Sequence, residues 1–414
     1  MNKRVVITGI GMLTPLANNT KDSWELLING QSGIDYIKSF NTSQFDCKYG
    51  GELKKFNEED YVNTKLHRRL DRSSILAIAA AKEALNDAEL EIPLIDAEKT
   101  GIALGTGIGG SHLLLENNEK LISKGPKRVS PFLITHMLPD TASGLLSIEL
   151  GAYGPNLAIT AACATGGTAI GEAFEIIKRG DANTMITGGF EASMQPIFLA
   201  GFQSMKALAI SEDPKSACKP FDINRSGFTL SEGSAILILE ELSVALRRKA
   251  NIYAEVISAG NAADGFDMTN PHQDGRGIVL AMNNAIEKGN VDLDKINYIN
   301  AHGSGTPIND KVETKAIKKI FKSHANHIAI SSTKSMIGHM MGATGAVEAA
   351  ITALVCKEQI VPPTINLNDS DPDCDLDYVP NQARKKDIEY AMSTSIGLGG
   401  HNSAIILKKW SNKQ

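Results

Sequence analysis

Residues 157–191, LAITAACATGGTAIGEAFEIIKRGDANTMITGGFE, contain two short β-rich runs on either side of one helical segment. The first run, residues 157–160, leads into the glycine-containing turn ACATGG at 162–167, and the second begins at residue 184. Between them, apolar side chains follow the helical spacing i, i+3, i+4 and i+7 at Ile170, Ala173, Phe174 and Ile177. Gly180 stands where a helix C′ residue is expected. The stretch therefore predicts strand, turn, helix and strand.

The same alternation extends over almost the whole chain and indicates an α/β architecture. A helix is predicted at residues 73–88, and another around 347–354, where the apolar spacing of the first helix recurs as a core-facing stripe. Strands are predicted at residues 4–8, 101–104, 157–160, 184–187, 235–240, 254–258, 298–300, 327–330 and 404–407.

A weak internal echo suggests that the chain has two similar halves. ACATGG precedes a helix in the first half, as SSTKSMIGHMMGATG at 331–345 does in the second. Each half also places a GG-containing turn beside a late strand, in MITGGFE at 185–191 and in TSIGLGGHN at 394–402. We expect a division into residues 1–250 and 251–414, and the absence of a low-complexity linker predicts one packed body.

Composition narrows the class of protein. The 414 residues are 42% apolar, and 42 Lys and Arg against 47 Asp and Glu give a net charge of −5. This balance argues against nucleic acid as the main partner. Five cysteines without a CxxC pair favour a reduced, cytoplasmic chain in which any special cysteine is catalytic.

No secretory or membrane segment is expected. The start of the chain has a basic residue pair and then apolar residues, but Gly9, Gly11 and Pro15 interrupt them, which favours a strand running into a glycine turn. The longest uncharged run, residues 150–171, is also rich in glycine and threonine and reads as strand, turn and helix start.

The loop GTGIGG at 105–110 formally matches the dinucleotide pattern G-x-G-x-x-G. That pattern requires an acidic residue about 20 positions later. Residues 126–131 contain Lys127 and Arg128 and no acid, so we expect a structural or pocket-lining loop.

Cys163 and two histidines form the candidate chemistry. Cys163 lies at a turn before a helix, where unpaired N–H groups and the helix dipole favour a thiolate. His302 in NAHGSGTPIND and His339 in KSMIGHMMGATG also lie on glycine-rich turns. The set suits nucleophilic and acid–base chemistry and lacks the close spacing of zinc ligands, so no metal is expected. His401 in GLGGHN is a further candidate, with a structural role at least equally favoured.

TAACATGG, NAHGSGTPIND, SSTKSMIGHMMGATGAVEA and GLGGHNS, in this order, resemble motifs of the β-ketoacyl-acyl-carrier-protein synthases of the KAS I/II type. The resemblance covers essentially the whole chain. It implies the α/β thiolase-like fold, in which two similar halves form an α-β-α-β-α five-layered body within a dimer. It also implies a decarboxylative Claisen condensation of malonyl-ACP with an enzyme-bound acyl thioester, without a cofactor beyond the phosphopantetheine of the acyl carrier protein (ACP).

The resemblance also implies roles for individual residues. Cys163 would carry the acyl chain, and its N–H and that of Leu398 would form the oxyanion hole. His302 and His339, as neutral imidazoles, would stabilise the enolate left by decarboxylation. Lys334 and Glu348 match a pair that supports the second histidine, and Ser304 and Thr306 match pantetheine contacts. Ile108 and Phe202, together with Leu398, match positions that line the acyl pocket. A basic surface that would bind ACP is matched by Lys65, Arg68, Arg69 and Lys206.

Several positions depart from the usual fatty-acid pattern. Ile396 and Leu398 stand where phenylalanines are usual, and Leu398 occupies the position that gates the two half-reactions. Together with HGSGT, LSEGSA at 230–235 and QDGRG at 273–277, they resemble the ketosynthase α subunit of type II polyketide synthases, whose partner is a chain-length-factor-like subunit. We therefore favour polyketide service, with a fatty-acid KAS II as the alternative.

Two further classes are less favoured. A non-catalytic chain-length factor would lack the nucleophile, whereas this chain has Cys163, His302 and His339 together. A thiolase acting on CoA thioesters would carry a second cysteine near the C-terminal GG loop, where this chain has only His401.

Overall fold

The computed structural model describes residues 3–411, which are built around one mixed sheet of ten strands. From one edge to the other the strand order is β10-β9-β13-β14-β8-β1-β7-β6-β4-β5. The strands span Val5–Leu13 (β1), Thr100–Gly105 (β4), Asn156–Ile159 (β5), Thr184–Glu191 (β6), Gly233–Glu241 (β7), Ala254–Ala263 (β8), Ile296–Asn300 (β9), Ala329–Ser331 (β10), Tyr390–Gly397 (β13) and His401–Lys409 (β14). Short pairs elsewhere join β2 (Asp35–Tyr36) to β3 (Tyr49–Gly50) and β11 (Ile360–Val361) to β12 (Arg384–Lys385).

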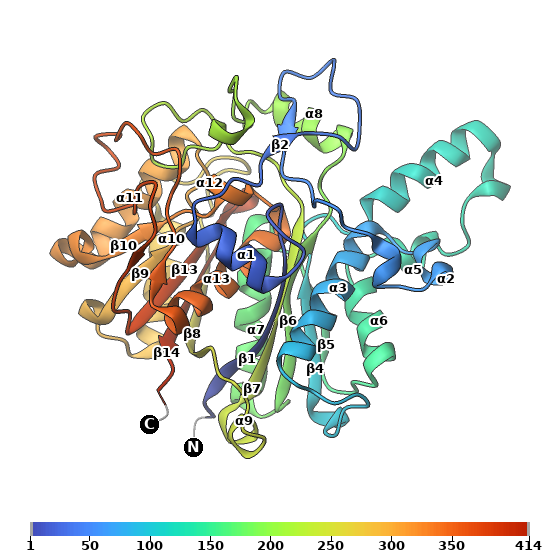
Figure 1. The fold of residues 1–414 in the computed structure, drawn as a ribbon, viewed down its shortest axis with the longest axis horizontal. Helices are drawn as coiled ribbons and strands as arrows, with labels where there is room; N and C mark the ends of the chain where they lie inside the picture. The colour runs from blue at the N-terminus through green and yellow to red at the C-terminus, as the bar shows by residue number, and fades with distance from the viewer. Residues whose placement is uncertain (1–2, 412–414) are drawn as a thin grey trace.

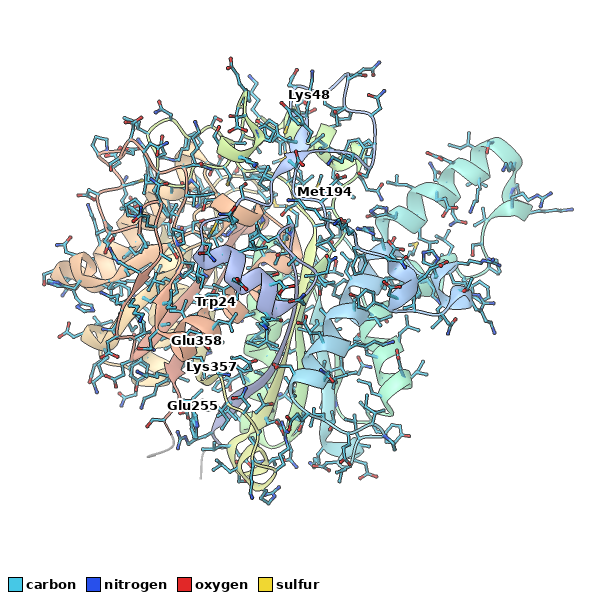
Figure 2. The ribbon with its side chains drawn as sticks, in the orientation of Figure 1. Trp24, Lys48, Met194, Glu255, Lys357 and Glu358 are labelled. Carbon is cyan, nitrogen blue, oxygen red and sulfur yellow. The ribbon has the colours of Figure 1, made fainter. Side chains whose placement is uncertain are left out.

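The sheet consists of the same five-stranded arrangement used twice. In one half β5, β4 and β6 are parallel, and β7 and β1 follow in antiparallel register. In the other half β10, β9 and β13 are parallel, and β14 and β8 follow in the same way. Only Val5–Ile7 and Ala254–Val256 pair across the join, where Arg4 also forms a 2.6 Å ion pair with Glu255 (Figure 2). The repeated connectivity agrees with the echo seen in the sequence.

Helices cover both outer faces and fill the space between the two halves of the sheet (Figure 1). Packing of α3 and α6 buries one outer face, and packing of α10 and α11 buries the other. Helices α7 and α13 lie between, which gives the five layers of a thiolase-like body. The longer helices span Thr20–Ile28 (α1), Arg72–Asp87 (α3), Ser111–Lys124 (α4), Thr141–Leu150 (α6), Thr165–Arg179 (α7), Pro196–Ser204 (α8), Arg276–Gly289 (α10), Pro307–Phe321 (α11) and Thr344–Glu358 (α13). The shorter ones are α2 (Thr64–His67), α5 (Leu133–Met137), α9 (Leu242–Arg247) and α12 (Lys334–Ile337).

Helix α13 lies in the middle layer and is buried on all sides, whereas the sequence predicts only one core-facing stripe. Every residue from Thr344 to Cys356 is buried, and exposure begins only at Lys357 and Glu358, which are labelled at the end of the helix in Figure 2. A helix that contacts packed layers on all sides needs no polar face. In α7, by contrast, the predicted stripe is confirmed, and Gly180 adopts the left-handed conformation expected of a C′ residue.

The expected glycine turn after the first strand is wrong. Strand β1 continues through Gly9 and Gly11 to Leu13, and α3 crosses it at very short range. A Cβ on Gly11 would lie 1.9 Å from the carbonyl oxygen of Ala80, and one on Gly9 would lie 2.3 Å from that of Ala84. These glycines therefore permit close packing of a helix on a strand, not a change of direction.

Two other expectations need correction. The GG of residues 188–189 lies inside β6, whereas Gly399 and Gly400 form a true turn with φ of 76° and 77°. Strand β13 was not among the predicted strands, and the predicted strand at residues 327–330 begins two residues later, as β10. Among residues 3–411, no helix has the length and apolar character needed to cross a membrane.

Candidate active site

Cys163 lies in a tight connection between β5 and α7. Ala162 adopts a left-handed φ of 48°, which turns the chain sharply before the helix begins at Thr165. The Thr165 hydroxyl accepts a 2.7 Å hydrogen bond from the Ala161 N–H and closes this turn. As a result, the Cys163 side chain lies at the N-terminal end of α7 while remaining 4% exposed.

The resting Cys163 is a thiol, contrary to the thiolate expected from its helix terminus. Burial raises the pKa of Cys163 to about 11. The backbone N–H groups of Leu398 and of Cys163 itself, and the charge of Lys334, lower it without compensating for the burial. The effect of these two N–H groups on the pKa places both of them close to the sulfur.

His339 is held by the backbone of its own loop. Its Nδ1 accepts a hydrogen bond from the N–H of Met341 at 3.1 Å and lies 2.9 Å from the Thr344 hydroxyl. Since Nδ1 is an acceptor, the proton of the neutral ring is on Nε2. Burial and the nearby Lys334 charge hold the pKa of His339 well below its usual value, so the ring is neutral and Nε2–H is available as a donor.

His302 follows β9 and faces His339. The two rings meet edge to face, with centroids 5.4 Å apart. The backbone N–H groups of His302 and Gly303 each donate a 2.8 Å hydrogen bond to the Glu313 carboxylate, which fixes the turn after the strand. Burial, Lys334 and His339 all lower the pKa of His302, so this imidazole is neutral as well.

Lys334 and Glu348 form a buried pair behind the histidines. The ammonium of Lys334 is fully buried and donates to the Glu348 carboxylate and, at 2.5 Å, to the carbonyl oxygen of His302. Burial raises the pKa of Glu348 to about 8, while the Lys334 charge opposes this rise. The pair therefore supports the His302 turn from the side away from the cavity.

A cavity of about 530 Å³ joins these groups. Its lining includes most of the residues expected at the site: Cys163, Phe202, Lys206, His302, Ser304, Thr306, His339 and Leu398. The hydroxyls of Ser304 and Thr306, predicted to contact pantetheine, lie 2.9 Å apart near the start of α11. Met341, Phe228 and Ile396 supply apolar lining.

The structure does not bring every expected residue to this cavity. Ile108 is half-buried and is not among the lining residues. The N–H groups of Gly107 and Ile108, which a nucleotide phosphate would need, donate instead to the Glu191 carboxylate. His401 is exposed and does not line the cavity, which agrees with a structural role.

The basic residues expected to bind ACP lie on the surface. Lys206 is at the cavity mouth, and Lys65 and Arg68 are exposed on and beside α2. The Arg69 guanidinium is held 3.9 Å from the ring centroid of Phe132, so part of its cationic face is already occupied.

Several buried carboxylates were not singled out from the sequence, among them Glu191, Glu313 and Asp310. Asp310 and Arg225 lie in one buried ion cluster, and Arg225 binds the carbonyl oxygens of Thr306 and Pro307. A weak signal exists for Glu313, since an acid at a position with apolar helical neighbours, Val312 and Ala316, requires buried partners.

Comparison with known proteins agrees with this geometry. The family model described as β-ketoacyl synthase, N-terminal domain, matches residues 2–245, and that of the C-terminal domain matches residues 253–368. The 3-oxoacyl-[acyl-carrier-protein] synthase 2 of Staphylococcus aureus (strain COL) is 47% identical, over 99% of each chain. The protein of the same name from Synechocystis is 46% identical over 99% of this chain and 98% of that one.

Solved structures show the same fold. A ketosynthase described in complex with a type II PKS acyl-carrier protein and bound to the hexaketide aligns with a TM-score of 0.92 and 32% identity, covering 99% of this chain and 100% of that one. The ishigamide ketosynthase/chain length factor gives 0.93 and 31%, with the same coverage. The fold and the site thus define a thiolase-like condensing enzyme. The chain belongs to the β-ketoacyl synthase family.

Proposed function

We propose that this chain is a β-ketoacyl-ACP synthase that extends an acyl thioester by two carbons from malonyl-ACP. The observation that carries the proposal is the single cavity onto which Cys163 and two neutral imidazoles, His302 and His339, open together. A nucleophile and two uncharged hydrogen-bond donors are what transfer of an acyl group followed by decarboxylation requires.

In the first half-reaction Cys163 sulfur attacks the acyl-ACP thioester carbonyl. The negative oxygen of the tetrahedral intermediate accepts from the N–H groups of Cys163 and Leu398. The pantetheine sulfur then leaves and takes up the proton that the Cys163 thiol loses. The acyl group remains as a thioester on Cys163.

In the second half-reaction malonyl-ACP loses carbon dioxide. The electron pair of the broken C–C bond passes into an enolate, whose oxygen accepts from His339 Nε2–H and from the His302 ring. These hydrogen bonds strengthen as negative charge develops, which lowers the barrier. The enolate carbon attacks the acyl carbonyl, 3-oxoacyl-ACP is released, and the Cys163 thiolate regains a proton.

The direct test replaces the nucleophile. Cys163→Ala should abolish formation of 3-oxoacyl-ACP and the mass increase of the protein after incubation with acyl-ACP. Cys356→Ala, in the buried α13, is the matched control and should retain both. Condensation that persists in Cys163→Ala would refute the proposal.

The carrier is proposed to dock beside the cavity mouth. Lys206 presents positive charge there, Lys65 and Arg68 are exposed on and beside α2, and a structural neighbour is described in complex with an acyl-carrier protein. An acidic carrier would approach such a surface with electrostatic guidance.

We also propose a dimer formed through β5. This strand is the sheet edge, and its residues are largely exposed, whereas β10 at the other edge is buried. Leu157 in the strand and the adjacent Ile148 and Tyr153 are 41%, 82% and 75% exposed. An apolar edge strand is an unpaired template, and a second ketosynthase-like chain, identical or a chain-length-factor-like subunit, would complete it.

Two pathways are candidates for this chemistry. Leu398 at the gating position and the polyketide ketosynthases among the structural neighbours favour polyketide service. The 47% identity with a 3-oxoacyl-ACP synthase 2 favours fatty-acid elongation. Mass measurement of ACP products in the absence of a reductase separates them: repeated condensation to a poly-β-keto chain indicates polyketide service, and a single two-carbon addition indicates fatty-acid elongation.

A further inference from the structure

Glu191, the last residue of β6, is a buried carboxylate between two loops of the active-site region. Its side chain is 1% exposed. It accepts hydrogen bonds from the Thr106 hydroxyl at 2.8 Å and from the N–H groups of Gly107 at 2.7 Å and Ile108 at 3.3 Å. It also accepts from the N–H of Gly342 at 3.0 Å. One carboxylate therefore holds the loop after β4 and the loop after His339.

These two loops are in direct backbone contact beside the carboxylate. A Cβ on Gly342 would lie 2.3 Å from the Gly107 nitrogen and 2.7 Å from Glu191 Oε2. A Cβ on Gly107 would lie 2.8 Å from the same oxygen. Only glycine fits at these positions, so the backbone N–H groups can reach the carboxylate without an intervening side chain.

The Gly342 contact acts on the catalytic ring through one peptide unit. Met341 N–H donates to His339 Nδ1, and the next N–H along the chain, that of Gly342, donates to Glu191. The two bonds are made by the peptide units on either side of Met341, so the Glu191 bond helps to hold the Met341 N–H against Nδ1, which keeps the ring proton on Nε2. Met341 also lines the cavity, and the residue that follows it, Gly342, is in contact with Gly107 of the loop after β4.

The hydrogen bonds to Glu191 favour its ionised form, and burial opposes it. Three of its four partners are backbone N–H groups, which can only donate. Burial raises the pKa of Glu191 to about 7, and the four hydrogen bonds lower it. The main influences on this pKa are burial and these hydrogen bonds. The carboxylate is therefore stabilised by hydrogen-bond donors and not by a neighbouring positive charge.

We propose that Glu191 is a positioning residue that joins the loop after β4 to the His339 loop, which includes the cavity-lining Met341, so that one carboxylate influences both the acyl chains the cavity accepts and the donor geometry of His339. This inference rests on the proposed condensation. It assigns to Glu191 a part in acyl-chain discrimination and enolate stabilisation without contact with substrate.

Glu191→Gln tests the proposal with almost unchanged side-chain volume. Its amide nitrogen would face N–H donors, so the link to one loop is lost. We expect kcat for condensation to fall about tenfold and the ratio of kcat/KM for long and short acyl-ACP donors to change by about fivefold. Thr106→Val removes the hydroxyl that ties Glu191 to the loop after β4 and leaves the Gly342 bond in place, so it should change that ratio more than kcat. Glu191→Asp keeps the charge but is too short to reach both loops, so it should not rescue kcat.

Glu83→Gln is the matched control, because Glu83 also holds two backbone N–H groups, those of Met12 and Thr20, in another part of the fold. It should lower stability without changing the chain-length ratio. The proposal is overturned if folded Glu191→Gln keeps the wild-type kcat and ratio, or if Glu191→Asp restores both. Wild-type protein without condensing activity would instead refute the proposed function. Amide hydrogen exchange at Gly107 and Gly342, expected to accelerate in Glu191→Gln, tests the link independently of activity.

Discussion

The ammonium group of Lys334 donates a 2.5 Å hydrogen bond to the carbonyl oxygen of His302, so a buried positive charge lies directly behind the residue that carries this imidazole. Its other partner is the Glu348 carboxylate. The cation fixes the His302 turn and lowers the pKa values of both histidine rings. Burial, the larger cause, and this cation together keep the two rings neutral.

Lys334→Met should destabilise the protein and remove condensing activity. It leaves Glu348 buried without its charge partner, which costs about 3–5 kcal/mol, and it releases the His302 carbonyl. The double variant Lys334→Met/Glu348→Gln should recover much of the stability in urea unfolding but none of the carbon dioxide release from malonyl-ACP. A single variant that decarboxylates at the wild-type rate would contradict this role.

His339→Gln should retain more activity than His339→Asn. The Gln amide nitrogen can occupy the position of Nε2, whereas the shorter Asn reaches only that of Nδ1, which already accepts from Met341. We expect about a tenfold difference in kcat for carbon dioxide release, comparable to the loss of one oxyanion donor. Equal rates in the two variants would show that Nε2–H is not the donor.

Leu398→Phe should narrow the acyl chains that the cavity accepts. Leu398 lines the cavity with Cys163, and a phenyl ring there takes up space beside the sulfur. For bulky acyl donors we expect kcat/KM to fall about tenfold relative to short ones. Leu398→Met, which conserves volume, should leave the ratio unchanged, and the oxyanion N–H is retained in both variants because it belongs to the backbone.

The two histidines should make the protein less stable in mild acid. Their folded-state pKa values lie well below 6.5, so below about pH 6.5 the unfolded chain binds protons that the folded chain does not. The stabilisation from the two neutral rings is therefore complete above that pH and is lost as the pH falls. The free energy of unfolding decreases by about 1.4 kcal/mol per pH unit for each ring. Urea unfolding between pH 7.5 and 5 measures this slope.

Comparison of variants separates the contribution of the two histidines from that of other groups that titrate in this range. Glu191 and Glu348 have raised pKa values of about 7 and about 8, so their contributions have the opposite sign and increase stability toward acid. His302→Gln/His339→Gln should remove the histidine component alone. His401→Gln, at an exposed ring, should leave the wild-type slope unchanged, and an equal effect of both changes would contradict the assignment.

Leu157→Asp should convert the proposed dimer to a monomer. It places a charge in the exposed apolar strand β5 at the sheet edge, where pairing with a second chain would bury it. Light scattering measures the mass. Leu280→Asp, at an exposed side chain of α10 on the outer face of the other half, is the control and should keep the wild-type mass. A wild-type monomer would refute the dimer proposal.

Much of the architecture is readable from local patterns. The strands around Cys163, the stripe in α7 and the Gly180 cap depend on neighbouring residues in the chain, and the structure confirms them. Gly9, Gly11 and the Gly188–Gly189 pair were misinterpreted because the reason for each glycine is a distant backbone. Gly188, for example, would place a Cβ 2.0 Å from the carbonyl oxygen of Ala235 in β7.

The candidate residues Cys163, His302 and His339 were visible because each stands on a turn whose glycines leave a reactive side chain without a packing role. The reactive residues and the repeated α/β pattern could therefore be identified from the sequence alone. Only the tertiary structure decided the protonation states, since burial makes Cys163 a thiol and both imidazoles neutral. It also decided that Glu191 links Gly107 to Gly342, 235 positions apart, because a carboxylate's partners are set by which loops meet in space and leave no trace in local spacing.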